Sequence, residues 1–402
     1  MATLAHLFID EKFIDSAHDS FEAVAPGDSR YFLLDPPTTL KYIRGFEPER
    51  VSISTMLGSN FLSSLATFDV VFIHALTDHA RAVVAKAPES VNFCWIGWGF
   101  DYYELISKRG DRILPLTAAA VANATQSPES TNLDRVHFNA RIKRAFARLS
   151  SLKSRLKLDK VLSQVGPGRS VEVSMLNKIH HFAPVLPEEG TSILHRGDLH
   201  FSLRDWNYGV HETIASFPTR QTNQGTNAII VGNSATPESN HFDAFAHLSD
   251  LQFDGVVVCP LSYGSAQYAN LVVQEGERRF AGRFKPLLSF MDISTYQSVM
   301  SNARFLYMNQ RRQQGLGNIL MALYAGTTVV LREENPLFCS LGNLDLPVVS
   351  VTDFDPASPP PQCDLNSVRK IVSDHFGRQN QLRRTRALID ACITSRPTLS
   401  QA

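Results

Sequence analysis

Short apolar runs alternate with helical patterns along most of the chain. Apolar runs rich in β-branched and aromatic residues predict buried strands, and the longer amphipathic stretches between them predict helices. Strands are expected over residues 2–9, 68–76, 90–99, 227–235, 254–264, 303–309, 327–333 and 346–351. Helices are expected over residues 79–88, 240–252, 317–326 and about 365–393.

Continuous apolar strands separated by helices are typical of parallel sheets that are covered on both faces. Two such series predict the α/β class, with two doubly wound, Rossmann-like domains. A polar, loop-like segment at 215–226 suggests the boundary between them, and a proline-rich segment at 353–364 precedes the last helical pattern. We therefore expect domains over 1–220 and 221–364, and a C-terminal helix within 365–402 that packs back on the first domain.

The composition narrows the class of protein. The 402 residues include 39 Lys and Arg and 39 Asp and Glu, and this balance argues against a general nucleic-acid binder. The five cysteines are scattered singly, which predicts reduced thiols in a cytoplasmic protein and no zinc motif. The first fifteen residues do not resemble a signal peptide, and the longest apolar runs are strand-sized, so we expect a soluble or peripheral membrane protein.

Two strand-to-helix turns in the second half are candidate anion sites. Gly232, Asn233 and Ser234 follow one predicted strand, and Arg311 and Arg312 precede Gly315, Gly317 and Asn318 at the start of a helix. A glycine-rich helix start brings backbone N–H groups close to a phosphate, and a neighbouring arginine can pair with it. The alternative is that both segments are ordinary tight turns with solvated arginines.

Other polar and aromatic residues lie at the expected strand ends of this half. Tyr263 could stack on a flat base or be an ordinary surface side chain, and Glu333, Glu334 and Asn335 follow a further strand.

The stretch CWIGWGFDYYEL, residues 94–105, concentrates aromatic and acidic side chains at a strand end. One interpretation is a buried strand followed by an acidic helix start. The other is an active-site loop with a catalytic carboxylate, because ligands of open α/β sheets bind at the carboxyl ends of strands.

Residues 141–160 carry eight basic residues and one acid, with apolar residues at helical spacing. Such a basic amphipathic helix can lie on an anionic membrane. The alternative is a helix that packs on its own domain and exposes a solvated basic face.

Several stretches resemble the bacterial 4-acetamido-4,6-dideoxygalactosyltransferases of enterobacterial common antigen synthesis, glycosyltransferase family 56. They are WIGWGFDYYEL, IIVGNSATPESNH, VVVCPLSYG and RQQGLGNILMALYAGTTVVLREENPLF. The similarity is good over about 60–105 and 215–340 and much looser over 110–215. The resemblance implies a GT-B fold and inverting transfer of a dideoxy amino sugar (Fuc4NAc-like) from a dTDP donor to a lipid-linked saccharide. It implies no metal and no cofactor.

On this hypothesis the second domain holds the dTDP-sugar donor through the strand-end residues named above. The first domain supplies a general base, with Asp101 expected in that role and Glu104 and His74 as reserves. Trp95, Trp98 and Tyr102 would bind the acceptor sugar. The protein would contact the cytoplasmic face of the inner membrane through 141–160, and no nucleic acid is expected. Alternatives are a GT-B enzyme with another nucleotide sugar or a non-lipid acceptor, and a non-catalytic sugar- or nucleotide-binding scaffold.

Overall fold

The structure of the protein is a computed structural model, which describes residues 2–126, 158–162, 169–208, 226–358 and 364–395. The chain divides into two compact units. Among these residues, unit 1 comprises 2–106, 158–162, 169–208 and 379–395, and unit 2 comprises 107–126, 226–358 and 364–378. The predicted boundary near 220 lies outside the described residues. Residues 107–126, which the prediction placed in the first domain, group with the second unit.

Unit 1 contains a seven-stranded, entirely parallel sheet in the order β3-β2-β1-β4-β5-β6-β7. Its strands are β1 (Leu4–Phe8), β2 (Ser29–Leu34), β3 (Glu49–Val51), β4 (Val70–His74), β5 (Phe93–Ile96), β6 (Ile179–Ala183) and β7 (Ser202–Leu203). Its helices are α1 (Ile14–Val24), α2 (Ile53–Met56), α3 (Ser59–Ser64), η1 (Leu65–Thr67), α4 (Asp78–Lys86), α5 (Tyr103–Ile106), α10 (Arg169–Leu176), α11 (Pro187–Leu194) and α19 (Arg378–Thr394).

Alternate strand residues of unit 1 face two different apolar layers. Val71 and Ile73 of β4 point toward the layer that includes α2, α3 and α4, whereas Val70 and Phe72 point toward α1 and α19. Burial of both faces explains why β4 is a continuous apolar run in the sequence. Removal of this apolar surface from water is the main driving force that holds the helices on the sheet.

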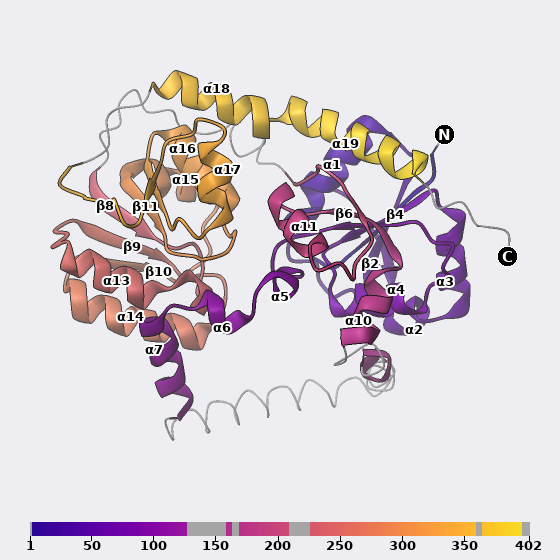
Figure 1. Cartoon of the computed structure of the whole chain (residues 1–402), viewed down its shortest axis with the longest axis horizontal. Helices are drawn as coiled ribbons and strands as arrows, with labels where there is room; N and C mark the ends of the chain where they lie inside the picture. Colours follow the sequence, from indigo (N-terminus) through magenta and orange to yellow (C-terminus); the bar gives the residue numbers. More distant parts are fainter. Residues whose placement is uncertain (1, 127–157, 163–168, 209–225, 359–363, 396–402) are drawn as a thin grey trace. The chain divides into compact units, whose positions relative to one another are not determined.

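Unit 2 contains a six-stranded parallel sheet in the order β10-β9-β8-β11-β12-β13. Its strands are β8 (Thr226–Val231), β9 (Val256–Pro260), β10 (Phe284–Leu287), β11 (Ala303–Met308), β12 (Thr328–Leu331) and β13 (Val348–Ser350). Its helices are α6 (Arg109–Arg112), α7 (Pro115–Gln126), η2 (Pro237–Ser239), α13 (His241–Asp250), α14 (Ala266–Phe280), α15 (Ile293–Asn302), α16 (Leu316–Ala325), α17 (Pro336–Gly342) and α18 (Leu365–Phe376). Helices α13 and α14 cover one face of the sheet, and α15, α16 and α17 lie on the other (Figure 1).

The C-terminal segment differs from the single helix that was expected. It forms two helices, because the backbone at Gly377 is extended and ends α18. Helix α18 packs against α16 in unit 2, whereas Leu388, Ile389 and Cys392 of α19 are buried in the apolar layer of unit 1. Only the second half of the segment therefore packs on the first unit.

Candidate functional site

The strand order of unit 2 predicts a ligand site at the carboxyl ends of its strands. In chain order the strands are arranged 3-2-1-4-5-6, so the direction of winding reverses between β8 and β11. Ligands of such sheets bind at the carboxyl ends of the strands, at this switch point. The two segments that leave these ends are 232–240 after β8 and 309–315 after β11, and both contain predicted site residues.

The segment after β11 leads into the N-terminus of α16. Gly315 is the N-cap residue, with φ of 70°, and no side chain caps the helix. A Cβ atom on Gly315 would lie 2.8 Å from the Met308 Cε atom and 3.0 Å from the Asn233 Nδ2 atom, so a side chain at this position would crowd both residues. Gly317 and Asn318 are partly exposed in the first turn. The uncapped N–H groups and the helix dipole make this end a favourable place for an anion.

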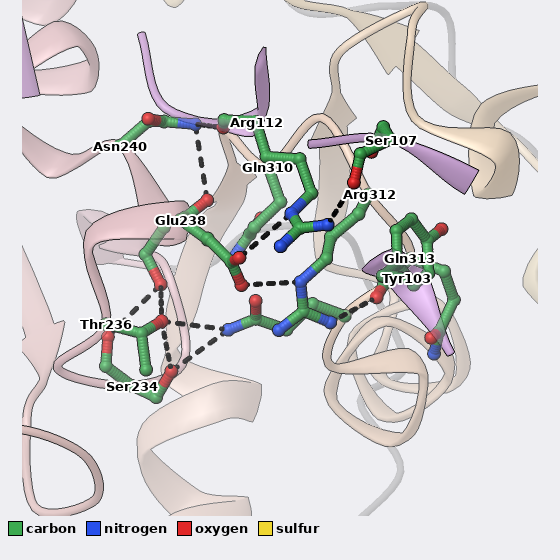
Figure 2. Close-up of polar contacts among 12 residues, drawn as sticks. Tyr103, Ser107, Arg112, Ser234, Thr236, Glu238, Asn240, Gln310, Arg312 and Gln313 are labelled. Carbon is green, nitrogen blue, oxygen red and sulfur yellow. Dashed lines mark hydrogen bonds and ion pairs between the residues drawn. The ribbon is translucent and has the colours of Figure 1, made fainter. Parts of the chain in front are cut away.

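A buried ion cluster lies beside this helix start (Figure 2). The Nε atom of Arg312 donates to one carboxylate oxygen of Glu238 at 2.7 Å, and the Nε atom of Arg112 donates to the other at 3.0 Å. Burial alone would raise the pKa of Glu238, but the charges and hydrogen bonds of Arg312 and Arg112 lower it. Two guanidinium groups share one carboxylate, so this trio carries a net positive charge at neutral pH.

Two asparagines fix the backbone around the cluster. Asn335, which was predicted to bind a ligand, is fully buried and donates to the carbonyl oxygens of Gln310 and Arg312. Its own Oδ1 accepts from the Leu337 N–H group at the start of α17. Asn335 therefore positions the loop after β11, and its amide is fully used within the protein.

Asn240 plays the corresponding part in the segment after β8. Its amide donates to the carbonyl oxygens of Arg112 and Asn309, and its Oδ1 accepts from the Leu114 N–H group. Neither Asn240 nor Arg112 was predicted from the sequence as a site residue. A left-handed backbone at Asn240, with φ of 53°, is the signal of a special conformation, but only the structure reveals it.

The segment after β8 carries three predicted residues to the same edge. Gly232 has φ of 69°, and its position faces the Nε2 atom of the buried His241 ring. Asn233 and Ser234 bond to the side chain of Gln314, so the segments after β8 and β11 are joined directly.

Three other predicted residues are more exposed. Tyr263, in the segment after β9, is 53% exposed, and its backbone carbonyl accepts from the Ala235 N–H group. Glu333 is exposed after β12, and Glu334 forms ion pairs with Arg332 and Arg311. Strand β8 lies between β9 and β11 in the sheet, so Tyr263, which follows β9, lies on the side of β8 away from β11.

In unit 1, the predicted base Asp101 is engaged on both carboxylate oxygens. Oδ2 accepts from the Leu76 N–H group and the Trp95 indole, and Oδ1 accepts from the Trp98 N–H group, each at 2.8 Å. Burial raises the pKa of this carboxyl, and the three donors partly oppose that rise. This geometry is that of a carboxylate that joins the ends of β4 and β5 and fixes the aromatic loop.

Two aromatic residues that were expected to bind an acceptor are part of the core. Trp95 is fully buried against Phe182, and Tyr102 is fully buried with its hydroxyl on Glu189. Neither ring surface reaches solvent in unit 1. The expectation that they form a sugar platform therefore does not match their burial, because alternation along β5 directs Trp95 into the sheet's apolar layer.

Trp98, the third aromatic residue that was expected to bind an acceptor, lies at the surface of unit 1. It is partly exposed and contacts the rings of Phe13, Phe100 and Tyr208. Phe13 and Phe100 are 38% and 56% exposed, so these aromatics form a surface cluster that the sequence analysis missed. Isolated phenylalanines in separate segments give no sequence signal of such a cluster.

His74 and Glu104 were the reserve bases. His74 is buried at the end of β4, bonded to His6 and to the Tyr208 hydroxyl, and burial lowers its pKa to about 3. Glu104 is exposed in the first turn of α5.

The described residues contain neither a ready metal site nor a membrane-spanning helix. No group of three or more His, Cys, Asp or Glu side chains in this part of the chain is arranged to hold a metal ion. None of the helices among the described residues has the length and apolarity needed to cross a bilayer. Most of the predicted basic helix, residues 141–157, lies outside the described residues.

Comparison with known proteins assigns a chemistry to this fold. Residues 195–357 match a family model described as 4-alpha-L-fucosyltransferase, glycosyl transferase group 56. This match covers the whole switch-point region of unit 2.

Solved structures of similar fold extend over both units. A UDP-forming α,α-trehalose-phosphate synthase from Burkholderia xenovorans has a TM-score of 0.57 at 12% identity, covering 99% of this chain and 100% of that one. The HepE protein of Anabaena, solved in complex with UDP and glucose, has a TM-score of 0.58 at 12% identity, covering 98% and 100%. Sucrose-phosphate synthase from Thermosynechococcus elongatus has a TM-score of 0.52 at 12% identity, covering 98% and 97%. The two parallel-sheet units have the GT-B fold, and together with the family match they support a glycosyltransferase enzyme.

Proposed function

We propose that this protein transfers a 4-acetamido-4,6-dideoxyhexose from a dTDP-sugar to a lipid-linked saccharide, with inversion at the anomeric carbon. The observation that carries the proposal is the uncapped N-terminus of α16, which lies at the switch point of unit 2 beside the positively charged Arg112–Glu238–Arg312 trio. The family match over 195–357 supports a deoxysugar as the transferred group.

The diphosphate of the donor belongs at the start of α16. Sugar transfer leaves a nucleoside diphosphate with increased negative charge on its terminal phosphate, and donors that are already in place stabilise that charge without reorganisation. The N–H groups at Leu316 and Gly317 and the charge of Arg312 supply such stabilisation. Glycine at position 315 allows the left-handed backbone that leads into this helix start, where a Cβ atom would crowd Met308 and Asn233.

The acceptor belongs to unit 1, at the aromatic cluster of Phe13, Trp98 and Phe100. Flat aromatic faces pack against the apolar faces of sugar rings. Glu104 is the base in this scheme, because its side chain is exposed to solvent, whereas Asp101 and His74 are buried. Asp101 then acts as a positioning residue for the loop.

The lipid portion of the acceptor implies work at a membrane surface. We assign the contact to the basic stretch 141–160, at the cytoplasmic face of the inner membrane. Sedimentation with anionic and neutral liposomes tests this assignment, with Lys153, Arg155 and Lys157 replaced by Gln in the comparison variant. Equal sedimentation of both proteins with anionic liposomes would contradict it.

The donor assignment is tested by calorimetry with dTDP, UDP and GDP. We expect dTDP to bind most tightly, and Arg312→Ala to weaken dTDP binding by about 1.5–3 kcal/mol through loss of a charge-assisted contact. Arg278→Ala, at an exposed ion pair on α14, is the control and should leave affinity unchanged. Tightest binding of UDP would favour another GT-B donor, and no nucleotide binding would favour a non-catalytic scaffold.

A further inference from the structure

Two glutamine side chains meet at the switch point of unit 2. The Nε2 atoms of Gln310 and Gln314 both donate to the Oδ1 atom of Asn233, at 3.2 and 3.0 Å. The Gln314 Nε2 atom also donates to the Ser234 hydroxyl at 3.0 Å. Gln310 is 0% exposed and Gln314 is half-buried. Because both amide nitrogens share one acceptor, the orientation of both amides is set by Asn233.

The oxygen atoms of the same two amides have no hydrogen-bond partner among the described residues, although both atoms are buried. Buried polar atoms in folded proteins are almost always paired, so two unpaired acceptors at one place call for an explanation. The neighbouring N-terminus of α16 presents N–H donors, which suit an anion. The amide oxygens need the opposite chemistry, because a phosphate at neutral pH offers them no hydrogen.

We infer that Gln310 and Gln314 accept hydrogen bonds from the sugar ring of the donor. This inference rests on the proposed function and deepens it by naming the residues that read the transferred sugar. In a nucleotide sugar the hexose is bonded directly to the terminal phosphate, so a hexose hydroxyl or acetamido N–H lies beside a diphosphate held at α16. The base is separated from that point by the diphosphate and the pentose. The amide oxygens of Gln310 and Gln314 would therefore contact a nucleotide sugar but not a nucleoside diphosphate that lacks the sugar.

The test compares Gln310→Met and Gln314→Met, which remove the amide while nearly preserving its volume. Gln274→Met, at an exposed position on α14, is the matched control. Calorimetry measures the dissociation constants of dTDP and of dTDP-α-D-glucose for each protein. We expect each site variant to bind dTDP-glucose about 5–10-fold more weakly, as for loss of one hydrogen bond, with less than a twofold change for dTDP.

A second series separates recognition from disturbance of the loop. We expect the wild type to bind a monodeoxy analogue of dTDP-glucose more weakly than dTDP-glucose itself when the analogue lacks the recognised hydroxyl. In the variant of the glutamine that accepts from this hydroxyl, the two ligands should bind with equal affinity. Equal weakening of dTDP and dTDP-glucose in both variants would assign the glutamines a structural role only, and unchanged affinity for both would also overturn the inference. If the wild type binds neither dTDP-glucose nor dTDP-4-acetamido-4,6-dideoxygalactose more tightly than dTDP, the sugar contact is absent although the nucleotide site stands. If the wild type binds neither dTDP nor the dTDP-sugar, both the proposed function and this inference fail. If Gln310→Met does not fold, the result for Gln314→Met decides the test, because Gln314 is the less buried of the two residues.

Discussion

At the scale of single residues, the side chains of Trp98, Tyr208, His74 and His6 form one continuous hydrogen-bonded series in unit 1, and all of them except Trp98 are buried. The Trp98 indole donates to the Tyr208 hydroxyl, which leaves the phenolic hydrogen for the Nδ1 atom of His74 at 2.7 Å. His74 then carries its hydrogen on Nε2 and donates to the Nδ1 atom of His6 at 3.0 Å, and the Nε2 atom of His6 faces the Ser29 hydroxyl. Both imidazoles are neutral in this arrangement, which burial requires.

This series predicts acid sensitivity of unit 1. Burial lowers the pKa of His74 from 6.5 to about 3 and lowers the pKa of His6 well below 6.5. Between pH 6.5 and about 3 the unfolded chain therefore binds protons that the folded chain does not, so stability falls as the pH falls, by up to about 1.4 kcal/mol per pH unit for each histidine. Denaturant unfolding of the wild type and of His74→Gln at pH 7 and 5 measures this. A slope with pH that is the same in both proteins would exclude His74 as a source.

A second residue-scale prediction concerns Asp101. Asparagine offers one acceptor oxygen where the carboxylate serves three donors, and its amide would face an N–H group. Asp101→Asn should therefore lower the free energy of unfolding by about 2–3 kcal/mol as well as the turnover. Glu104→Gln should leave stability within about 0.5 kcal/mol and lower turnover by about 10²–10⁴-fold. A stable Asp101→Asn protein that has lost turnover would return the base role to Asp101.

At the scale of elements, the apolar pattern identified the strands that are buried on both faces. All eight expected strands overlap observed ones, namely β1, β4, β5, β8, β9, β11, β12 and β13. The missed strands are short or carry polar residues, such as β2 (SRYFLL), β6 (IHHFA) and β10 (FKPL), so their sequence pattern does not differ from that of a loop. The glycine-rich start of α16 and the end of that helix at Gly326, with φ of 83°, were predicted because glycine has a specific backbone role at both positions.

The Arg112–Glu238–Arg312 trio ties α6, η2 and the segment after β11 together. Replacement of Glu238 by Gln removes the charge that both guanidinium groups share in a largely buried site. We expect a loss of about 3 kcal/mol in the free energy of unfolding, because uncompensated buried charges remain. Glu334→Gln, at a more exposed ion pair, is the control and should cost less than about 1 kcal/mol. Equal effects of the two changes in urea unfolding would show that the trio has no special role.

Replacement of Gly315 tests whether the N-terminus of α16 binds the nucleotide. Gly315→Ala places a Cβ atom against Met308 and Asn233 in a left-handed backbone, and we expect a cost of about 1–2 kcal/mol together with weaker dTDP binding. Gly342→Ala, at a position with nothing within 4 Å, should change neither quantity appreciably. Unaltered dTDP affinity in Gly315→Ala would place the diphosphate elsewhere.

At the scale of the whole molecule, the sequence predicted two doubly wound α/β units but not which segments belong to each. Residues 107–126 group with unit 2, where Leu116 and Thr117 donate to Asp243. The C-terminal helices divide at Gly377 between the two units. Contacts between residues that are 45 to 300 positions apart decide these assignments, and the local hydrophobic pattern contains no information about them. The same reason explains why Arg112 and Gln310 were missed as site residues.

Transfer from a dTDP-sugar can be measured in a reaction with the purified protein. Purified protein is incubated with dTDP-4-acetamido-4,6-dideoxygalactose and a lipid-linked saccharide, dTDP release is quantified, and NMR determines the anomeric configuration of the product. We predict dTDP release that depends on the acceptor, with a product of inverted configuration. Release that occurs only with a UDP- or GDP-sugar, a product of retained configuration, or no transfer from any donor would rule out inverting transfer from a dTDP-sugar.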